Sequence, residues 1–132
     1  MPIALLPESF TGDPEFYGVD LHMHSTASDG ALAPAEVVAL CALRGVKLMA
    51  LTDHDTVAGV SEAAAAASRQ GIRLLPGAEL STRWQGISIH IVALLPQGPR
   101  GPLMEGLEIL ARARESRAVV IARRMEKAGL EN

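Results

Sequence analysis

The sequence has little of what stabilises secreted or membrane proteins. Its 132 residues include one cysteine, Cys41, so a disulfide within the chain is excluded and a reducing compartment is favoured. No apolar run approaches the roughly 18 residues that a membrane-spanning helix needs. The first 17 residues lack the basic start of a secretory signal. We therefore expect a cytoplasmic protein with no membrane partner.

Aromatic residues and net charge are also scarce. Aromatic side chains make up 3% of a chain that is 48% hydrophobic, so the core must be aliphatic, and we expect Cys41 to be a small buried member of it. The formal net charge of −3 by itself gives no electrostatic attraction to nucleic acid, DNA included, or to a membrane surface, so affinity for phosphate would have to come from bound metal or a local arginine cluster. The length suits one domain. The prolines and glycines near the start predict an irregular leader over residues 1–15, followed by a domain over 16–132.

Hydrophobic periodicity and breaker residues predict alternating strands and helices. The expected strands are Val19–His24, Val46–Leu51, Ile72–Leu75 and Ile87–Leu95, and the expected helices are Pro34–Arg44, Val60–Gln70 and Leu103–Ala128. This order predicts an α/β fold with a mainly parallel sheet and right-handed crossovers. Polar residues that follow the strands should gather at one edge of that sheet.

Histidine is scarce as well, and three of the four histidines lie within four residues of a carboxylate. His22 and His24 alternate in Asp20-Leu-His-Met-His-Ser25, which points both side chains to one face of a strand. His54 lies between two aspartates in Leu51-Thr-Asp-His-Asp-Thr56, and His90 lies in Ile89-His-Ile91. Imidazoles mixed with carboxylates suit Mn²⁺, Zn²⁺ or Fe²⁺, and more than four ligands indicate a multinuclear catalytic site.

Each of these features also has an ordinary structural explanation. Two histidines in one strand can be unrelated, and His90 can be a core histidine with satisfied hydrogen bonds. Asp29 in Ser28-Asp-Gly30 can be a turn residue, and Glu79 can be a surface carboxylate or a helix cap. The joint pattern favours the metal site, with Asp20, Asp53 and Asp55 as supporting residues that fix the orientation of the ligands.

Two further residues are candidates for contact with a substrate phosphate. Ser25 follows the His-x-His pair, and Arg117 lies in the arginine-rich helix near the C-terminus. The alternatives are a turn hydroxyl for Ser25 and a solvated helix face for Arg117.

Four segments together resemble the polymerase and histidinol phosphatase (PHP) superfamily. They are Asp20-Leu-His-Met-His-Ser-Thr-Ala-Ser-Asp-Gly30, Leu51-Thr-Asp-His-Asp-Thr56, Gly77-Ala-Glu-Leu-Ser81 and Ile89-His-Ile-Val92. The similarity extends over about residues 16–132. It is strongest to the stand-alone bacterial branch that includes 3′,5′-nucleoside bisphosphate phosphatases and the 5′→3′ exoribonuclease RNase AM.

The resemblance implies up to three divalent ions, with Mn²⁺ expected first, on a distorted (βα)₇ barrel. His22 and His24 would bind one ion, Asp29 and His54 a second, Glu79 would bridge two, and His90 would reach the third. A metal-activated water would attack the phosphate, with no protein nucleophile. The expected substrates are 3′,5′-bisphosphonucleotides, as in the conversion of pAp to AMP, or short RNA trimmed from its 5′ end.

The sequence departs from the family pattern in one way that concerns whether it contains the complete metal site. The branch completes its site with a further histidine and an Asp-x-His pair later in the chain, and nothing after His90 supplies them. We therefore expect the N-terminal portion of the barrel, inactive alone. The alternatives are another phosphomonoesterase of the histidinol phosphatase kind and a non-catalytic structural or interaction module. The sequence leaves the oligomeric state open.

Overall fold

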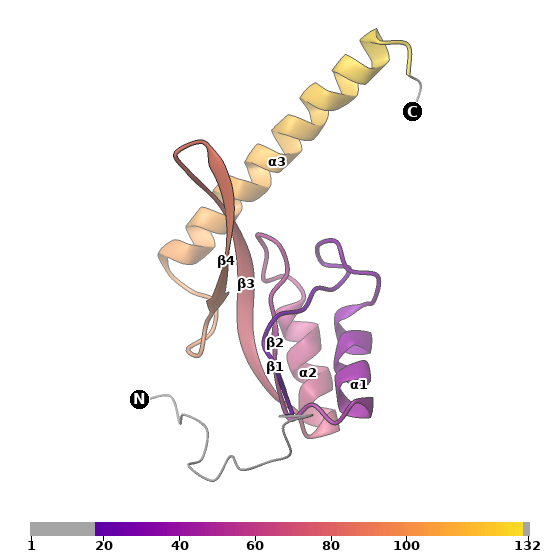
Figure 1. Ribbon diagram of the computed structural model, residues 1–132, viewed down its shortest axis with the longest axis vertical. Coiled ribbons are helices and arrows are strands. Elements are labelled where there is room, and N and C mark those ends of the chain that lie inside the picture. Colours follow the sequence, from indigo (N-terminus) through magenta and orange to yellow (C-terminus); the bar gives the residue numbers. More distant parts are fainter. Residues whose placement is uncertain (1–17, 131–132) are drawn as a thin grey trace. The chain divides into compact units, whose positions relative to one another are not determined.

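The structure is a computed structural model that describes residues 18–130, so the expected leader over 1–15 lies outside the described residues. The described residues form four strands and three helices, which are labelled in Figure 1. They are β1 (Val19–Asp20), α1 (Pro34–Leu43), β2 (Leu48–Leu51), α2 (Val60–Gln70), β3 (Arg73–Trp84), β4 (Ile87–Leu94) and α3 (Pro102–Lys127). The chain divides into two compact units, residues 1–99 and residues 100–132, and each is described by itself.

The first unit is a sheet in the order β1-β2-β3-β4 with two helices against it. The pairs β1–β2 and β2–β3 are parallel, and β3–β4 is an antiparallel hairpin. Helices α1 and α2 lie beside each other along the parallel strands (Figure 1). The mixed α/β class and the mainly parallel sheet are therefore as the sequence predicts.

The core lies between the parallel strands and these two helices. It is aliphatic, as the composition predicts, and consists of small and medium side chains: Val37, Val38, Cys41, Val46, Met49, Leu51, Ala63, Ala66, Ala67 and Ile72. Burial raises the pKa of the Cys41 thiol, and the nearby charge of Asp20 adds to the effect. The prediction that Cys41 is a small buried member of the core is confirmed.

The helix limits follow from local chemistry. Helix α1 begins at Pro34, whose fixed φ suits a first turn, and Glu36 accepts a hydrogen bond from the backbone N–H of Ala33 at 2.8 Å. Helix α2 ends at Gly71, which has the left-handed φ of +68° that an L side chain rarely adopts. Both helices match the predicted limits to within about a residue.

Two strands differ from the predicted ranges. Regular pairing of β1 ends at Asp20, and Met23 is held instead by Thr52, whose Oγ accepts from the Met23 N–H at 3.1 Å and whose N–H donates to the Met23 carbonyl at 2.9 Å. Strand β3 continues to Trp84 because β4 folds back and pairs with Gly77–Trp84. Gly77 permits this approach, since a Cβ there would lie 2.9 Å from the Ala93 carbonyl.

The second unit contains α3, a helix of 26 residues with mostly exposed side chains. An ion pair on this helix joins Arg112 to Glu108 at 3.7 Å, and both side chains are about three-quarters exposed. Such a pair adds little to stability. Within residues 18–130, no helix has the length and hydropathy of a membrane span.

Candidate metal centre

Glu79 lies at the middle of the histidine cluster. His22 Nε2 lies 2.9 Å from Glu79 Oε2, and His24 Nε2 lies 3.0 Å from the same oxygen. The two imidazole nitrogens are 3.2 Å apart. The alternation predicted for His22 and His24 therefore brings both side chains to one carboxylate, although regular pairing of β1 ends before them.

Asp29 and His54 form a second group with His24. His54 Nε2 lies 3.4 Å from Asp29 Oδ2, and His24 Nδ1 lies 3.6 Å from Asp29 Oδ1. The rings of His24 and His54 are stacked with centroids 4.4 Å apart. His24 Nδ1 is buried without a hydrogen-bond partner among the described residues, which is unusual for a polar atom.

His90 completes a third group on the other oxygen of Glu79. His90 Nδ1 lies 3.2 Å from Glu79 Oε1, and the His54 and His90 rings meet edge to face with centroids 5.1 Å apart. The alternative in which His90 is an isolated core histidine is wrong, since its side chain is 48% exposed and faces the cluster.

The six side chains form three overlapping groups, each with ligand atoms within 4.8 Å of one another. These are His22 with His24 and Glu79, His24 with Asp29 and His54, and His54 with Glu79 and His90. Two donors at about 2.0–2.2 Å from one ion lie roughly 3.0–3.4 Å apart at ordinary coordination angles. The separations above are of this size, and the orphaned His24 nitrogen needs a partner, so the donor set fits divalent metal ions.

Glu79 is the most deeply buried of these side chains, at 9% exposure. The hydrogen bond with His22 is the main cause that holds the pKa of Glu79 below its usual range. Burial opposes this effect, and the charges of His54 and His22 support it. Glu79 is therefore a carboxylate at neutral pH and supplies negative charge at the bottom of the cluster.

The strand pattern explains why Glu79 lies there. The sequence predicts it in a loop after a strand, but it lies inside β3, where it pairs with Val92 on one side and bridges to His54 on the other. His90 and Glu79 come from neighbouring strands of the hairpin. Their meeting depends on the register of β3 with β4, which residue spacing alone does not give.

The three aspartates expected to orient the imidazoles accept hydrogen bonds from backbone and hydroxyl groups. Asp20 accepts from the His22 backbone N–H at 3.3 Å, Asp53 accepts from Ser25 and Ser28, and Asp55 accepts from the Ser81 backbone N–H at 2.6 Å. Their supporting role stays a prediction, with these contacts as its geometry.

The two candidates for phosphate contact differ in their surroundings. Ser25 is fully buried, and its hydroxyl donates to Asp53 at 2.7 Å, which is the geometry of a structural contact. Arg117 lies on an exposed part of α3 in the other unit. Both assignments stay predictions. The residue pattern does not indicate a role for Ser28 or Thr52, whose hydroxyls donate to Asp53 and to the Met23 carbonyl. Each precedes a candidate ligand or its neighbour by one residue, which is the only signal available.

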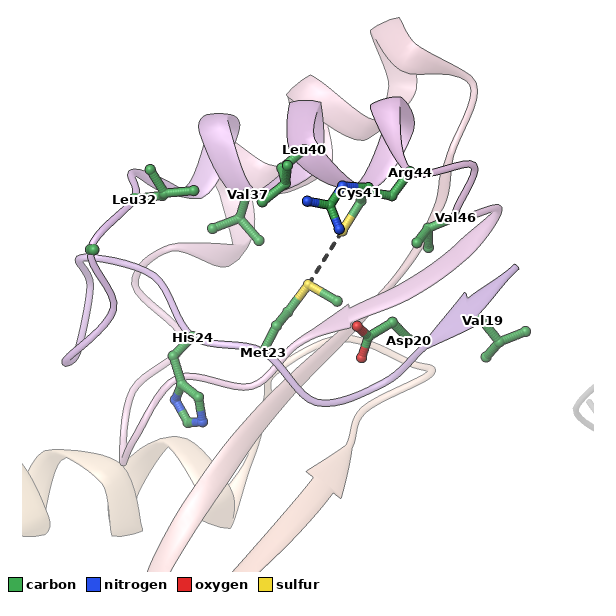
Figure 2. A pocket seen from close by; sticks show the side chains of 11 residues that line it. Val19, Asp20, Met23, His24, Leu32, Val37, Leu40, Cys41, Arg44 and Val46 are labelled. Carbon is green, nitrogen blue, oxygen red and sulfur yellow. Dashed lines mark hydrogen bonds between the residues drawn. The ribbon is translucent and has the colours of Figure 1, made fainter. Parts of the chain in front are cut away.

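A pocket of about 550 Å³ lies between β1 and α1 (Figure 2). Apolar side chains dominate its lining, including Val37 and Leu40, with Asp20 and Arg44 at its polar parts. Figure 2 shows Cys41 and Met23 across it, joined by a sulfur contact of 3.6 Å. His24 also borders the pocket, but its ring points away from it in this view.

Comparison with known proteins identifies the family. A family model described as the PHP domain matches residues 20–128. The chain belongs to the PHP domain family. The six candidate ligands lie within the matched range, and the mixed α/β sheet is part of a PHP barrel.

Two curated relatives of this PHP chain carry enzymatic names. A 5′-3′ exoribonuclease of Haemophilus influenzae is 48% identical over 113 residues, which cover 86% of this chain and 41% of the relative. A 3′,5′-nucleoside bisphosphate phosphatase of Chromobacterium violaceum is 45% identical over 112 residues, covering 85% and 39%. The chain thus spans about two-fifths of the length of these relatives.

Solved structures show the same fold. An amidohydrolase from Chromobacterium violaceum, solved with bound sulfate, superposes with a TM-score of 0.76 at 44% sequence identity. The match covers 87% of this chain and 40% of the amidohydrolase chain. A candidate metal-dependent phosphoesterase from Bifidobacterium adolescentis gives 0.76 at 28% identity, with coverage of 83% and 38%.

Proposed function

We propose that the protein containing this chain is a metal-dependent phosphoesterase of the PHP type. Its substrates are 3′,5′-bisphosphonucleotides, short RNA trimmed in the 5′→3′ direction, or both. The proposed cofactors are up to three divalent ions, with Mn²⁺ first and Zn²⁺ or Fe²⁺ as the alternatives. The convergence of four imidazoles on Glu79 and Asp29 is the observation that carries this proposal.

The relatives support the substrate class. One is named a bisphosphate phosphatase and another an exoribonuclease, and both names describe hydrolysis of phosphate esters of nucleotides. The Chromobacterium violaceum structure contains sulfate, a tetrahedral oxyanion like phosphate. A nucleotide or a short RNA, with no DNA and no membrane, is therefore the proposed partner, and the cytoplasm the proposed location.

We propose the following roles for the residues of this chain in binding the ions. His22 and His24 would hold one ion, Asp29 and His54 a second, and His90 a third, with the Glu79 carboxylate shared between two of them. Ions bound there would supply an activated water and offset the charge on the phosphate. The ionised Glu79 offsets the charge of the ions from the buried side, while the imidazole edges stay open toward the substrate side.

The test is release of inorganic phosphate from adenosine 3′,5′-bisphosphate by the full-length protein with added Mn²⁺, beside degradation of a short 5′-phosphorylated RNA. We expect metal-dependent turnover of at least one substrate and loss of turnover with a chelator. If inorganic phosphate were released from histidinol phosphate and from neither nucleotide substrate, the protein would be a phosphomonoesterase of the histidinol phosphatase kind. A full-length protein that binds no Mn²⁺ and hydrolyses none of these would favour the non-catalytic module.

A further inference from the structure

The loop that carries Asp29 is fastened to a buried carboxylate from another segment. Asp53, which is 1% exposed, accepts from the Ser25 N–H at 2.6 Å, from the Ser25 hydroxyl at 2.7 Å and from the Ser28 hydroxyl at 2.7 Å. A carboxylate is buried at low cost only when its oxygens are bonded in this way. Ser28 immediately precedes Asp29, so the position of Asp29 depends on this network.

A second carboxylate on the other side of His54 fastens a different segment. Asp55 Oδ1 accepts from the Ser81 N–H at 2.6 Å, and the Asp55 N–H donates to the Glu79 carbonyl at 3.0 Å. Strand β2 ends at Leu51, so Asp55 holds β3 beyond the end of its regular parallel partner. Ser81 pairs with His90 across the hairpin, and Asp55 thus supports the strand pair that carries Glu79 and His90.

The backbone of Asp55 adopts a conformation that few residue types tolerate. Its φ is +51°, in the left-handed region that costs an L residue energy but that aspartate and asparagine tolerate better than most. With this φ the chain turns at Asp55, and the Asp55 carboxylate reaches the Ser81 N–H. The neighbouring His54 side chain faces the histidine cluster.

We propose that Asp53 and Asp55 are positioning residues that act on different parts of the metal centre. Asp53, with Ser28, sets the place of Asp29 and hence of the group that contains His24, Asp29 and His54. Asp55 sets the place of Glu79 and His90 through Ser81. The proposal rests on the proposed function only in that the centre binds divalent ions; it does not depend on which ester is hydrolysed.

The first test is a double-mutant cycle on Mn²⁺ binding by the full-length protein, measured by equilibrium dialysis without substrate. We expect Ser28→Ala to weaken one class of bound ion by about 10- to 100-fold, because it removes the hydrogen bond to Asp53 that holds the loop of Asp29 in place. Asp29→Asn should weaken the same class, and Ser28→Ala should add nothing in the Asp29→Asn background because it acts through Asp29. Ser28→Thr should restore binding, and Ser68→Ala on the exposed face of α2 is the matched control.

The second test separates the side chain of Asp55 from its backbone conformation. Asp55→Gly accepts the positive φ but loses the bond to Ser81, whereas Asp55→Asn keeps both. We expect Asp55→Gly to weaken Mn²⁺ binding by about 10- to 100-fold. The added effect should be smaller in the His90→Ala background, where only the effect through Glu79 remains. Asp55→Asn should bind Mn²⁺ nearly as the parent does. Additive effects of Ser28→Ala with Asp29→Asn, or of Asp55→Gly with His90→Ala, would overturn the proposal.

Amide hydrogen exchange of the metal-free protein gives a readout that needs neither metal nor substrate. Ser28→Ala should speed exchange over residues 25–30 and leave residues 79–82 unchanged, and Asp55→Gly should do the reverse. Equal loosening of both segments by either variant would overturn the division of roles. A protein that passes these tests but releases no phosphate would contradict the proposed function and leave this inference standing.

Discussion

Asp29 and Glu79 are the two carboxylates of the candidate centre, and they lie in opposite surroundings. The side chain of Glu79 is 9% exposed inside β3, whereas that of Asp29 is 68% exposed on a loop. Backbone pairing on both sides fixes Glu79. Asp29 depends on the side-chain network of Asp53. The same chemical group is thus positioned in one case by the sheet and in the other by a few polar side chains.

The largest effect should come from Glu79→Gln, which removes the charge that three of the four imidazoles approach most closely. Because Glu79 belongs to two of the three ligand groups, we expect Mn²⁺ affinity and phosphate release to fall by more than about 100-fold. Dialysis and phosphate assays measure this, with the exposed Glu115→Gln as the control. A loss no greater than that of Asp29→Asn would remove the distinction between the two carboxylates.

Asp29→Asn should have a smaller effect, because Asp29 belongs to one ligand group and is open to water. We expect phosphate release to fall by about 10- to 100-fold, with part of the bound Mn²⁺ retained. Asp29→Glu keeps the charge and should recover part of the activity in the same assay. Complete loss of bound Mn²⁺ would mean that the loop of Asp29 and strand β3 with Glu79 do not bind metal independently of each other.

Gly30→Ala tests whether the loop is held at a fixed place. A Cβ at Gly30 would lie 2.6 Å from the His24 carbonyl oxygen, so the loop or the backbone of His24 must shift. We expect a loss of about 1–3 kcal/mol in the free energy of unfolding, measured by urea denaturation. Gly86→Ala is a control for steric crowding, since a Cβ there meets nothing within 4 Å, although its φ of +81° adds strain. Unchanged stability of Gly30→Ala would show that the loop adjusts freely.

The smallest effect concerns pH and the metal-free protein. Because the pKa of Glu79 is lower in the folded state than its ordinary value of 4.5, its ionisation stabilises the fold above that pH, and this contribution is lost as pH falls through the folded pKa. The difference in unfolding free energy between the parent and Glu79→Gln should therefore shrink below pH 4.5. A difference that grows as pH falls would contradict the sign of this linkage.

Local signals predicted the helices and the class of the sheet. Pro34 and Gly71 mark helix ends by their own backbone preferences, so their effect does not depend on the rest of the fold. The length of β3 could not be predicted in the same way. Pro76 and Gly77 look like a loop in isolation. Pairing of Pro76 with Leu51 of β2 and of Gly77 with Leu94 of β4 makes them part of a strand.

The sequence by itself determined the family and the residue types of the candidate centre, because four short motifs carry all the histidines and the carboxylates beside them. Tertiary structure decided which of these residues meet. His22 and Glu79 are 57 residues apart, and strand pairing brings them to 2.9 Å. It also decided that Asp53 binds the Asp29 loop and Asp55 binds β3. Such contacts follow from the register and spacing of strands across space, which local propensity does not specify.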